Sequence, residues 1–245
     1  MSQNIYDNEI FFEGYKELRN RDDNYNKLLE QPAMVDLLPN LSDKIVLDLA
    51  CGYGYNSLDF IKRNAKKVVG IDISQKMLNV AKSKSANKNI EYICMDMAEI
   101  SQFKQKFDFV YCSLAFHYVE DFKKLCEDIF ALLNNTGQLL FSQEHPIITA
   151  TIDGKGHFNN DESGKKVSYT FSNYNQGGIR KTHWIIDDVI KYHRPIGEII
   201  TTLAKTGFII EEVVEPIPKD WAINKLPTIV KEYIKPNFLI IKARK

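Results

Sequence analysis

Short apolar runs and amphipathic segments alternate along the first two thirds of the chain. The apolar runs have the length of strands and cover residues 44–49, 67–71, 90–95, 107–112 and 138–142. The segments between them space their apolar residues as helices do, over about 55–63, 74–84 and 119–133. Strands that alternate with helices predict a parallel sheet with right-handed crossovers.

Local signals predict where these helices begin and end. Ser74 is placed to cap the helix that follows it, because a serine hydroxyl can accept a hydrogen bond from a free amide of the first turn. Residues 134–137, Asn-Asn-Thr-Gly, predict the end of the third helix and a turn into the fifth strand.

A different pattern follows from residue 147 to about 193. Glycines punctuate short segments rich in tyrosine, threonine, phenylalanine and tryptophan, which is typical of an antiparallel ribbon and not of further strand and helix units. We interpret this segment as an insertion that roofs the carboxyl edge of the sheet. Its aromatic residues could line an apolar pocket or pack as cross-strand pairs; they are Tyr169, Phe171, Tyr174 and Trp184.

The two ends of the chain complete the predicted fold. Pro195 opens a helix that Gly207 ends, and residues 208–214 and 237–243 supply two closing strands, of which we expect the last to be antiparallel. Residues 1–43 predict helices near 11–19 and 25–38 that are too short to fold alone. The expected fold is α/β, with a doubly wound, mostly parallel seven-stranded sheet. Its parts are an N-terminal helical segment (1–43), an α/β core (44–146), a β-rich cap (147–193) and a closing segment (194–245).

Composition narrows the function. The chain has 245 residues, and its 32 basic and 32 acidic side chains balance without a run of like charge, which disfavours nucleic acid as a partner. Neither a signal peptide nor an apolar run of membrane-spanning length is found, so we expect a soluble, cytoplasmic protein. Four cysteines without a C-x-x-C pair suggest neither disulfides nor a zinc site, and we expect them to be reduced packing residues. The oligomeric state is left open.

The richest chemistry follows the first strand, where a turn bears Gly52 and Gly54. A strand that ends in a carboxylate, Asp48, and enters such a turn allows close approach of a ligand, and Asp72 ends the next strand. A dinucleotide fits poorly, because Ser57 stands where its third glycine belongs and Asp48 would face the pyrophosphate. S-adenosylmethionine fits better, since it carries an ammonium, a sulfonium and a ribose diol that Asp72 could bind.

These residues resemble the class I, seven-stranded S-adenosylmethionine-dependent methyltransferases, and within them the small-molecule enzymes of ubiquinone and menaquinone biosynthesis. Residues 46–54 are similar to the first motif of that family, with Ala50 where the first glycine usually stands. Residues 69–74 resemble the second motif, which implies that Asp72 binds the ribose and Ile73 the adenine face. Residues 94–97 resemble the third motif, which implies that Asp96 accepts from the adenine amino group beside Met97. An acid at that position can also simply cap the next turn.

The resemblance implies further contacts to the methyl donor. Ser113, Leu114 and His117 follow the fourth strand and should face the sulfonium. Met77 is a further candidate for cofactor binding. Tyr15 and Arg19, about one helical turn apart, could reach the methionine carboxylate, or could equally belong to a solvated helix face.

The acceptor of the methyl group would need a base if it is a hydroxyl or an ammonium. The candidates are His117, Glu144, His145 and His193, and each also has a structural interpretation. His117 could be a hydrogen-bonded core residue, and Glu144 could pair with Arg194. Alternatively, Arg194 could clamp a carboxylate of the substrate.

Three functions are compatible with these patterns. The leading hypothesis is methyl transfer to a small molecule, because the fourth strand is not followed by Asn-Pro-Pro-Tyr or Asp-Pro-Pro-Tyr, and Cys112 is not followed by proline. A second hypothesis is a sensor or scaffold that binds the donor without transferring methyl. A nicotinamide oxidoreductase is the third, and Asp48 and Ser57 disfavour it.

Overall fold

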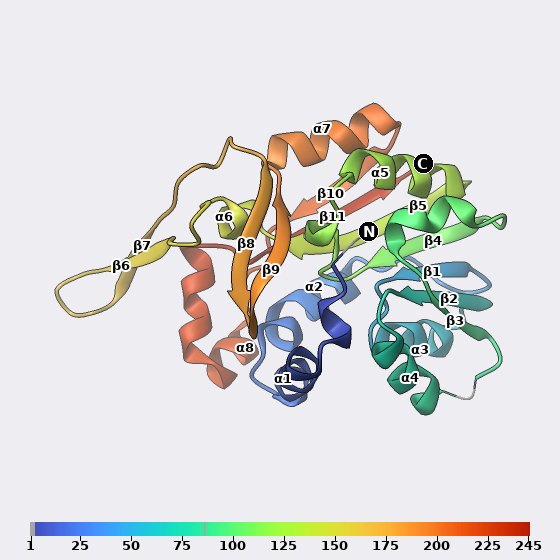
Figure 1. Ribbon diagram of the computed structural model, residues 1–245, viewed down its shortest axis with the longest axis horizontal. Coiled ribbons are helices and arrows are strands. Elements are labelled where there is room, and N and C mark those ends of the chain that lie inside the picture. Colours follow the sequence, from blue (N-terminus) through green and yellow to red (C-terminus); the bar gives the residue numbers. More distant parts are fainter. Residues whose placement is uncertain (1–2, 86) are drawn as a thin grey trace.

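The computed structural model describes residues 3–85 and 87–245 and contains a seven-stranded sheet flanked by helices (Figure 1). The strand order is β10-β11-β5-β4-β1-β2-β3. The strands are β1 (Ile45–Leu49), β2 (Lys67–Asp72), β3 (Ile90–Cys94), β4 (Phe107–Cys112), β5 (Leu133–Glu144), β10 (Ile209–Val214) and β11 (Phe238–Arg244). The predicted fold class is confirmed.

Strand direction follows the prediction. β1 lies between β2 and β4 and pairs in parallel with both, and β3 and β5 extend the parallel sheet on either side. β11 is antiparallel to β5 and to β10, between which it lies. The carboxyl ends of β1, β2 and β4 therefore meet at one edge, where parallel α/β sheets bind ligands.

Helices cover both faces of the sheet. Successive side chains of each strand point to opposite faces, so apolar side chains on both faces need helices to pack against. Leu47 and Leu49 of β1 pack in the cluster that includes α5 (Phe122–Leu132) and α7 (Ile196–Thr206). Val46 packs on the other face with Phe60 of α3 (Tyr55–Lys62). α4 (Gln75–Lys84) lies next to β2 and β3 and buries Met77.

The predicted helix ends agree with the structure, except at the turn after α5. The Ser74 hydroxyl accepts from the Met77 amide at 3.1 Å, and Gly207 ends α7 in the left-handed conformation. The predicted turn at 134–137, however, lies inside β5, which begins directly after α5. Phe107 pairs with Leu133, and Phe109 pairs with Gln138. Residues 134–137 therefore form an irregularity within β5 that lengthens the strand, and they do not form a separate loop.

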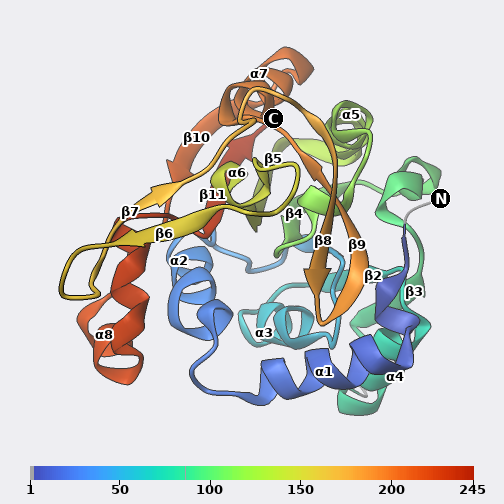
Figure 2. The same cartoon turned by 60° about the vertical axis from the view of Figure 1, so that its left-hand side comes forward.

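The N-terminal segment is helical, as expected, with one irregular turn. It contains η1 (Ile5–Asp7), α1 (Glu9–Asn20) and a π-helical turn η2 (Asn26–Glu30) that continues into α2 (Gln31–Asp36). Figure 2 shows α1 below the tip of the hairpin formed by β8 (Gly178–Trp184) and β9 (Ile186–His193). Phe11 of α1 contacts Trp184 there, with ring centroids 5.1 Å apart.

The predicted ribbon consists of two antiparallel hairpins. The β8–β9 hairpin crosses the end of the sheet, whereas the hairpin of β6 (His157–Asn160) and β7 (Lys166–Thr170) projects away from it (Figure 1). The remaining short helices are η3 (Met97–Gln102), η4 (Phe116–Tyr118), α6 (Pro146–Thr149), α8 (Asp220–Lys225) and η5 (Pro227–Tyr233).

The four cysteines and the apolar character of the helices are the last features predicted from the sequence. Cys51, Cys112 and Cys126 are buried and unbonded, but Cys94 is exposed, so the expectation of four packing residues is wrong for that one. Among residues 3–85 and 87–245, no helix is both long and apolar enough to cross a membrane.

Candidate functional site

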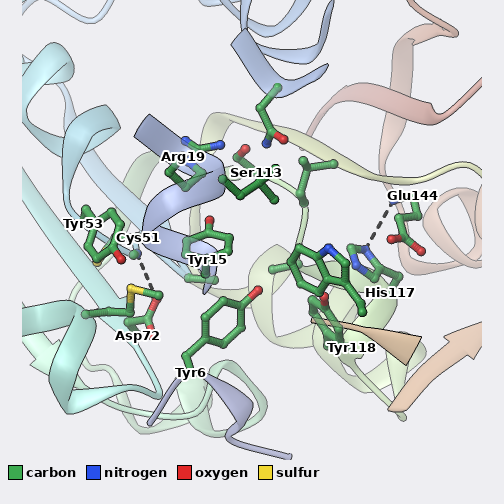
Figure 3. A pocket seen from close by; sticks show the side chains of 18 of the residues that line it. Tyr6, Tyr15, Arg19, Cys51, Tyr53, Asp72, Ser113, His117, Tyr118 and Glu144 are labelled. Atoms are coloured by element: carbon green, nitrogen blue, oxygen red, sulfur yellow. Dashed lines mark hydrogen bonds between the residues drawn. The ribbon is translucent and has the colours of Figure 1, made fainter. Parts of the chain in front are cut away.

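A cavity of about 490 Å³ lies at the carboxyl edge of the sheet. One part of its lining, which we name the glycine end, consists of Ala50, Gly52, Asp72, Ile73 and Met97. The opposite part, the histidine end, consists of His117, Tyr118, Glu144 and Trp184. Figure 3 shows Asp72 and His117 on opposite sides of the cavity, with Tyr6 and Tyr15 between them.

The turn after β1 has three residues with positive φ. Ala50, Gly52 and Gly54 have φ of 53°, 54° and 72°. A Cβ added to Gly54 would lie 2.2 Å from Tyr92 Oη and 3.0 Å from Ala81 Cβ, whereas one added to Gly52 would meet nothing within 4 Å. Gly54 is therefore required by packing, while Gly52 leaves open space on the cavity side. Ala50 has a conformation that costs an L-residue roughly 1 kcal/mol.

Asp72 is held at the glycine end by backbone amides. Its two carboxylate oxygens accept hydrogen bonds from Gly52 N at 2.9 Å and Ser74 N at 2.8 Å. Burial raises the pKa of Asp72 to about 6, although both amides favour the charged form. Each oxygen keeps a further acceptor site, so the carboxylate can still bind two hydroxyl groups of a ligand.

Asp48 and Gly54 support the site from behind. Asp48 accepts from the Ser57 hydroxyl at 2.5 Å, and burial raises its pKa to about 7. Neither Asp48 nor Gly54 is among the residues that line the cavity. Ser57, which stands where a dinucleotide-binding motif has its third glycine, thus supplies the hydrogen bond that the buried Asp48 carboxyl group needs.

The structure brings the other predicted cofactor residues into one cavity. Those that line it are Tyr15, Arg19, Ala50, Gly52, Asp72, Ile73, Met77, Asp96, Met97, Ser113 and Leu114. Asp96 also accepts from Ala98 N at 3.0 Å and so caps η3, while its contact with the adenine stays a prediction.

His117 is neutral, and its hydrogen bond determines which nitrogen carries the proton. Its Nδ1 accepts from Glu144 N at 3.3 Å, so the neutral ring has its proton on Nε2. Burial lowers the pKa of His117 to about 4. This histidine can donate a hydrogen bond through Nε2, but in this arrangement it is a poor proton acceptor.

Glu144 pairs with Lys191 and not with Arg194, the partner that one of the two open interpretations gave it. Lys191 Nζ lies 2.6 Å from Glu144 Oε1. Burial raises the pKa of Glu144, but Lys191, together with His117 and Lys235, outweighs this and holds the pKa below the usual value. Arg194 instead donates to the carbonyl oxygens of Val119 and Glu120, which joins β9 to the segment before α5.

The structure places two of the predicted bases elsewhere. His145 Nδ1 accepts from Ile147 N at 3.1 Å and its Nε2 lies 2.7 Å from Glu215 Oε1, so this ring caps α6. His193 lies between Thr149 Oγ1 and the carbonyl of Tyr174, each 2.8 Å away. Neither histidine is among the cavity-lining residues.

The four aromatic residues predicted to line a pocket also differ in whether they reach the cavity. Trp184 lines the cavity, whereas Phe171 packs against Tyr169 and Tyr174, with ring centroids 6.3 and 6.1 Å apart. Only one of the four predicted pocket aromatics therefore reaches the site.

Sequence reasoning missed several residues of the site. Tyr6 and Tyr118 line the cavity, and Glu30 lies behind Ser113, whose hydroxyl donates to it at 2.8 Å. A weak signal existed for Glu30, since it directly follows Leu28 and Leu29 in a helix pattern. An acid in an apolar stretch indicates a buried partner, but it does not identify that partner.

Comparison with known proteins agrees with this geometry. The methyltransferase domain family matches residues 46–137. A solved structure of an S-adenosylmethionine-dependent methyltransferase from Mesorhizobium loti is 32% identical, covers 93% of this chain and 100% of its own, and superposes with a TM-score of 0.83. This chain belongs to the S-adenosylmethionine-dependent methyltransferases.

Two other relatives of this methyltransferase differ in how much of the chain they match. An uncharacterized protein from Haemophilus influenzae is 36% identical over 98% of this chain and 96% of its own length. The ubiquinone biosynthesis O-methyltransferase of Coxiella burnetii is 34% identical over 42% of this chain and 44% of its own.

The cofactor of this family, S-adenosylmethionine, fits the residues of the glycine end. The open space beside Gly52 admits a ligand against the backbone, and the Asp72 carboxylate has free acceptor sites. The cavity volume is also within the usual range of about 300–1,000 Å³ for small-molecule sites.

Proposed function

We propose that this methyltransferase acts on a small-molecule acceptor, which binds at the histidine end of the cavity while the methyl donor occupies the glycine end. The observation that carries the proposal is a single cavity of about 490 Å³ lined by both ends. Residues of η1, α1 and the β8–β9 hairpin lie over it, so a bound acceptor would be enclosed and not held on an open surface.

For the donor, we assign roles to the lining residues. Asp72 binds the ribose hydroxyls, Ile73 and Met97 flank the adenine, and Asp96 accepts from its amino group. Arg19 is suited to the methionine carboxylate, because it lines the cavity and makes no ion pair with any residue in the described ranges. Tyr15 packs beside it, with the Arg19 guanidinium 6.0 Å from the ring centroid.

The donor supplies a methyl group already activated by a positively charged sulfur. The protein must therefore orient an attacking atom in line with that methyl and exclude water. Tyr118 and Trp184 offer apolar ring surface for this purpose, and His117 Nε2 offers a hydrogen-bond donor to a polar group of the acceptor.

A small acceptor also agrees with the relatives. The matched Coxiella burnetii enzyme is named for O-methylation in ubiquinone biosynthesis, and the match covers 42% of this chain. We carry over only the size class of the acceptor, since the match covers less than half of either chain.

The first test is isothermal titration calorimetry with S-adenosylmethionine and S-adenosylhomocysteine. We expect both to bind the wild-type protein. The matched variants are Asp72→Ala, which should weaken binding, and Asp59→Ala on the exposed surface of α3, which should not.

The second test separates the enzyme from a donor-binding sensor. Tritium-labelled donor is incubated with a cell metabolite extract, filtered to retain only small molecules, and the products are separated by chromatography. Label in a small molecule supports the proposal, whereas donor binding without labelled product would favour the sensor.

A further inference from the structure

Glu30 is a wholly buried carboxyl group directly behind the cavity wall. Its exposed fraction is 0%, and it ends the π-helical turn η2. Glu30 Oε1 accepts from Ser113 Oγ at 2.8 Å and from Ser142 Oγ at 2.6 Å. Its Oε2 has no hydrogen-bond partner among the described residues. A carboxyl group is costly to bury when it is not fully hydrogen-bonded or paired with a charge.

The charged and titratable groups around Glu30 leave it without an ion pair. Arg19 of α1 is the cation that acts on it, at longer range than a salt bridge. The charge of Glu30 in turn helps to raise the pKa of Tyr111 and Cys112 of β4 and of Tyr15 of α1. Burial raises the pKa of Glu30, and the two serine hydroxyls and Arg19 only partly oppose this.

The two serines differ in one respect. Ser113 lines the cavity, between the two ends in the view of Figure 3, whereas Ser142 does not line it. Ser113 Oγ therefore connects the cavity to Glu30, and Ser142 touches the same oxygen from within the sheet. This gives a pair of hydroxyl groups with the same partner and different access to a ligand.

The acids and bases at the histidine end are poor proton acceptors. His117 Nδ1 already accepts from an amide, and Glu144 is paired with Lys191. Asp72 accepts from two backbone amides at the glycine end. Burial raises the pKa of both Asp72 and Glu30, but Asp72 belongs to the glycine end, whereas Glu30 reaches the cavity between the two ends through Ser113.

We propose that Ser113 and Glu30 form a proton relay that deprotonates the methyl acceptor during transfer. The inference rests on the proposed function. An acceptor X–H bond breaks as the X–CH₃ bond forms, and its proton passes to Ser113 Oγ while the Ser113 proton passes to Glu30 Oε1. The electron pair of the broken S–CH₃ bond stays on sulfur, which becomes neutral. Glu30 then returns its proton to Ser113 Oγ, and the hydroxyl proton of Ser113 passes to water in the cavity.

The relay has physical requirements that this site meets. A base is most effective when its pKa is near the working pH, and burial moves Glu30 in that direction. A serine between substrate and base lets a carboxyl outside the cavity accept a proton from inside it. Ser113 touches the substrate in this scheme, and Glu30 acts through it.

The titration of Glu30 can be measured directly. In protein labelled with ¹³C at the glutamate side-chain carboxyls, the Glu30 signal is the one lost in Glu30→Gln. We expect its midpoint, in the complex with S-adenosylhomocysteine, to lie above that of an ordinary glutamate. With S-adenosylmethionine the midpoint should fall, because the sulfonium adds a positive charge nearby. An ordinary midpoint, or one identical in both complexes, would overturn the relay.

The serine pair supplies the matched variants. With tritium-labelled donor and a metabolite extract as acceptor, Ser113→Ala and Glu30→Gln should lower turnover by about 10² to 10⁴-fold. Ser142→Ala removes a hydrogen bond to the same carboxylate but leaves the relay in place. We expect it to retain most of the turnover, with its pH profile displaced to higher pH because the Glu30 pKa rises.

Two outcomes would contradict the relay while leaving the proposed function intact. One is wild-type turnover in Ser113→Ala, and the other is an equal loss in Ser142→Ala and Ser113→Ala. A wild-type protein that binds donor and labels nothing would contradict the proposed function instead, and the Glu30 titration would still decide the relay.

Discussion

The two ends of the cavity are built in different ways. The glycine end comes from consecutive strands, β1 to β3, and from the short turns that follow them, so its residues lie within about fifty positions of one another. The histidine end combines η4, the last residue of β5 and the tip of the β8–β9 hairpin. The first end depends on backbone geometry and the second on contacts between distant segments.

This difference has a functional consequence. Backbone amides hold Asp72, so the glycine end is held by the sheet itself. The histidine end is held by a buried ion pair from β5 to β9 and by the N-terminal segment packed on Trp184. We expect changes at one end to leave the other largely intact, and the predictions below test that separation.

The largest expected effect is at the histidine end. Glu144→Gln leaves Lys191, which is 5% exposed, without its charged partner, and breaking a buried pair costs roughly 3–5 kcal/mol. Urea denaturation should show this loss of unfolding free energy. Adding Lys191→Met should recover much of it, and Glu127→Gln, from an exposed pair on α5, should cost little. A small loss in Glu144→Gln would mean that the pair does not hold this end together.

Glycine substitutions test the turn after β1. Gly54→Ala combines positive φ with overpacking against Tyr92 and Ala81, so we expect a loss of about 2–4 kcal/mol in unfolding free energy. Gly52→Ala should cost only about 1 kcal/mol but should weaken donor binding, because its methyl group enters open space. Denaturation and calorimetry together distinguish the two, and equal stability losses would contradict this account.

Donor affinity should depend on Asp72. Asp72→Ala removes charge-assisted hydrogen bonds, and we expect a loss of roughly 1.5–3 kcal/mol in binding free energy by calorimetry. Trp184→Phe at the histidine end is the control and should leave donor affinity nearly unchanged. Unchanged affinity in Asp72→Ala would show that this residue does not bind the ribose.

The pH dependence of donor binding sharpens the same assignment. In the free protein Asp72 is protonated below about pH 6, because burial raises its pKa, and ribose binding favours the charged form. Affinity should therefore fall as the pH drops below about 6, approaching tenfold, or about 1.4 kcal/mol, per pH unit. Calorimetry between about pH 5 and pH 7 measures this slope, and Asp72→Asn should flatten it.

The smallest expected effect concerns Ala50. Ala50→Gly relieves the positive φ at this position but adds backbone entropy to the unfolded chain, so we expect a gain of only about 0.5 kcal/mol. Thermal denaturation checks this, with Ala98→Gly in η3 as a destabilising control. A loss of stability on Ala50→Gly would show that the alanine conformation is not strained.

Sequence reasoning succeeded where function follows strand order. Because the carboxyl ends of parallel strands share an edge, the spacing of Asp72 and Asp96 was enough to predict that both line one site. It failed where a side chain could face either way along a segment. His117, His145 and His193 were all predicted as candidate bases, and of these three only His117 lines the cavity.

The periodicity of the apolar residues and the glycine-bearing turn by themselves determined the sheet, its mostly parallel direction and the glycine end of the cavity. These features depend on residues that are close together in the sequence and on the backbone geometry that those residues favour. Only the tertiary structure decided that Glu144 pairs with Lys191, that Glu30 lies behind Ser113 and that Trp184 alone of its group reaches the cavity. Those contacts join segments far apart in sequence, and which partner a buried charge finds depends on how the segments pack.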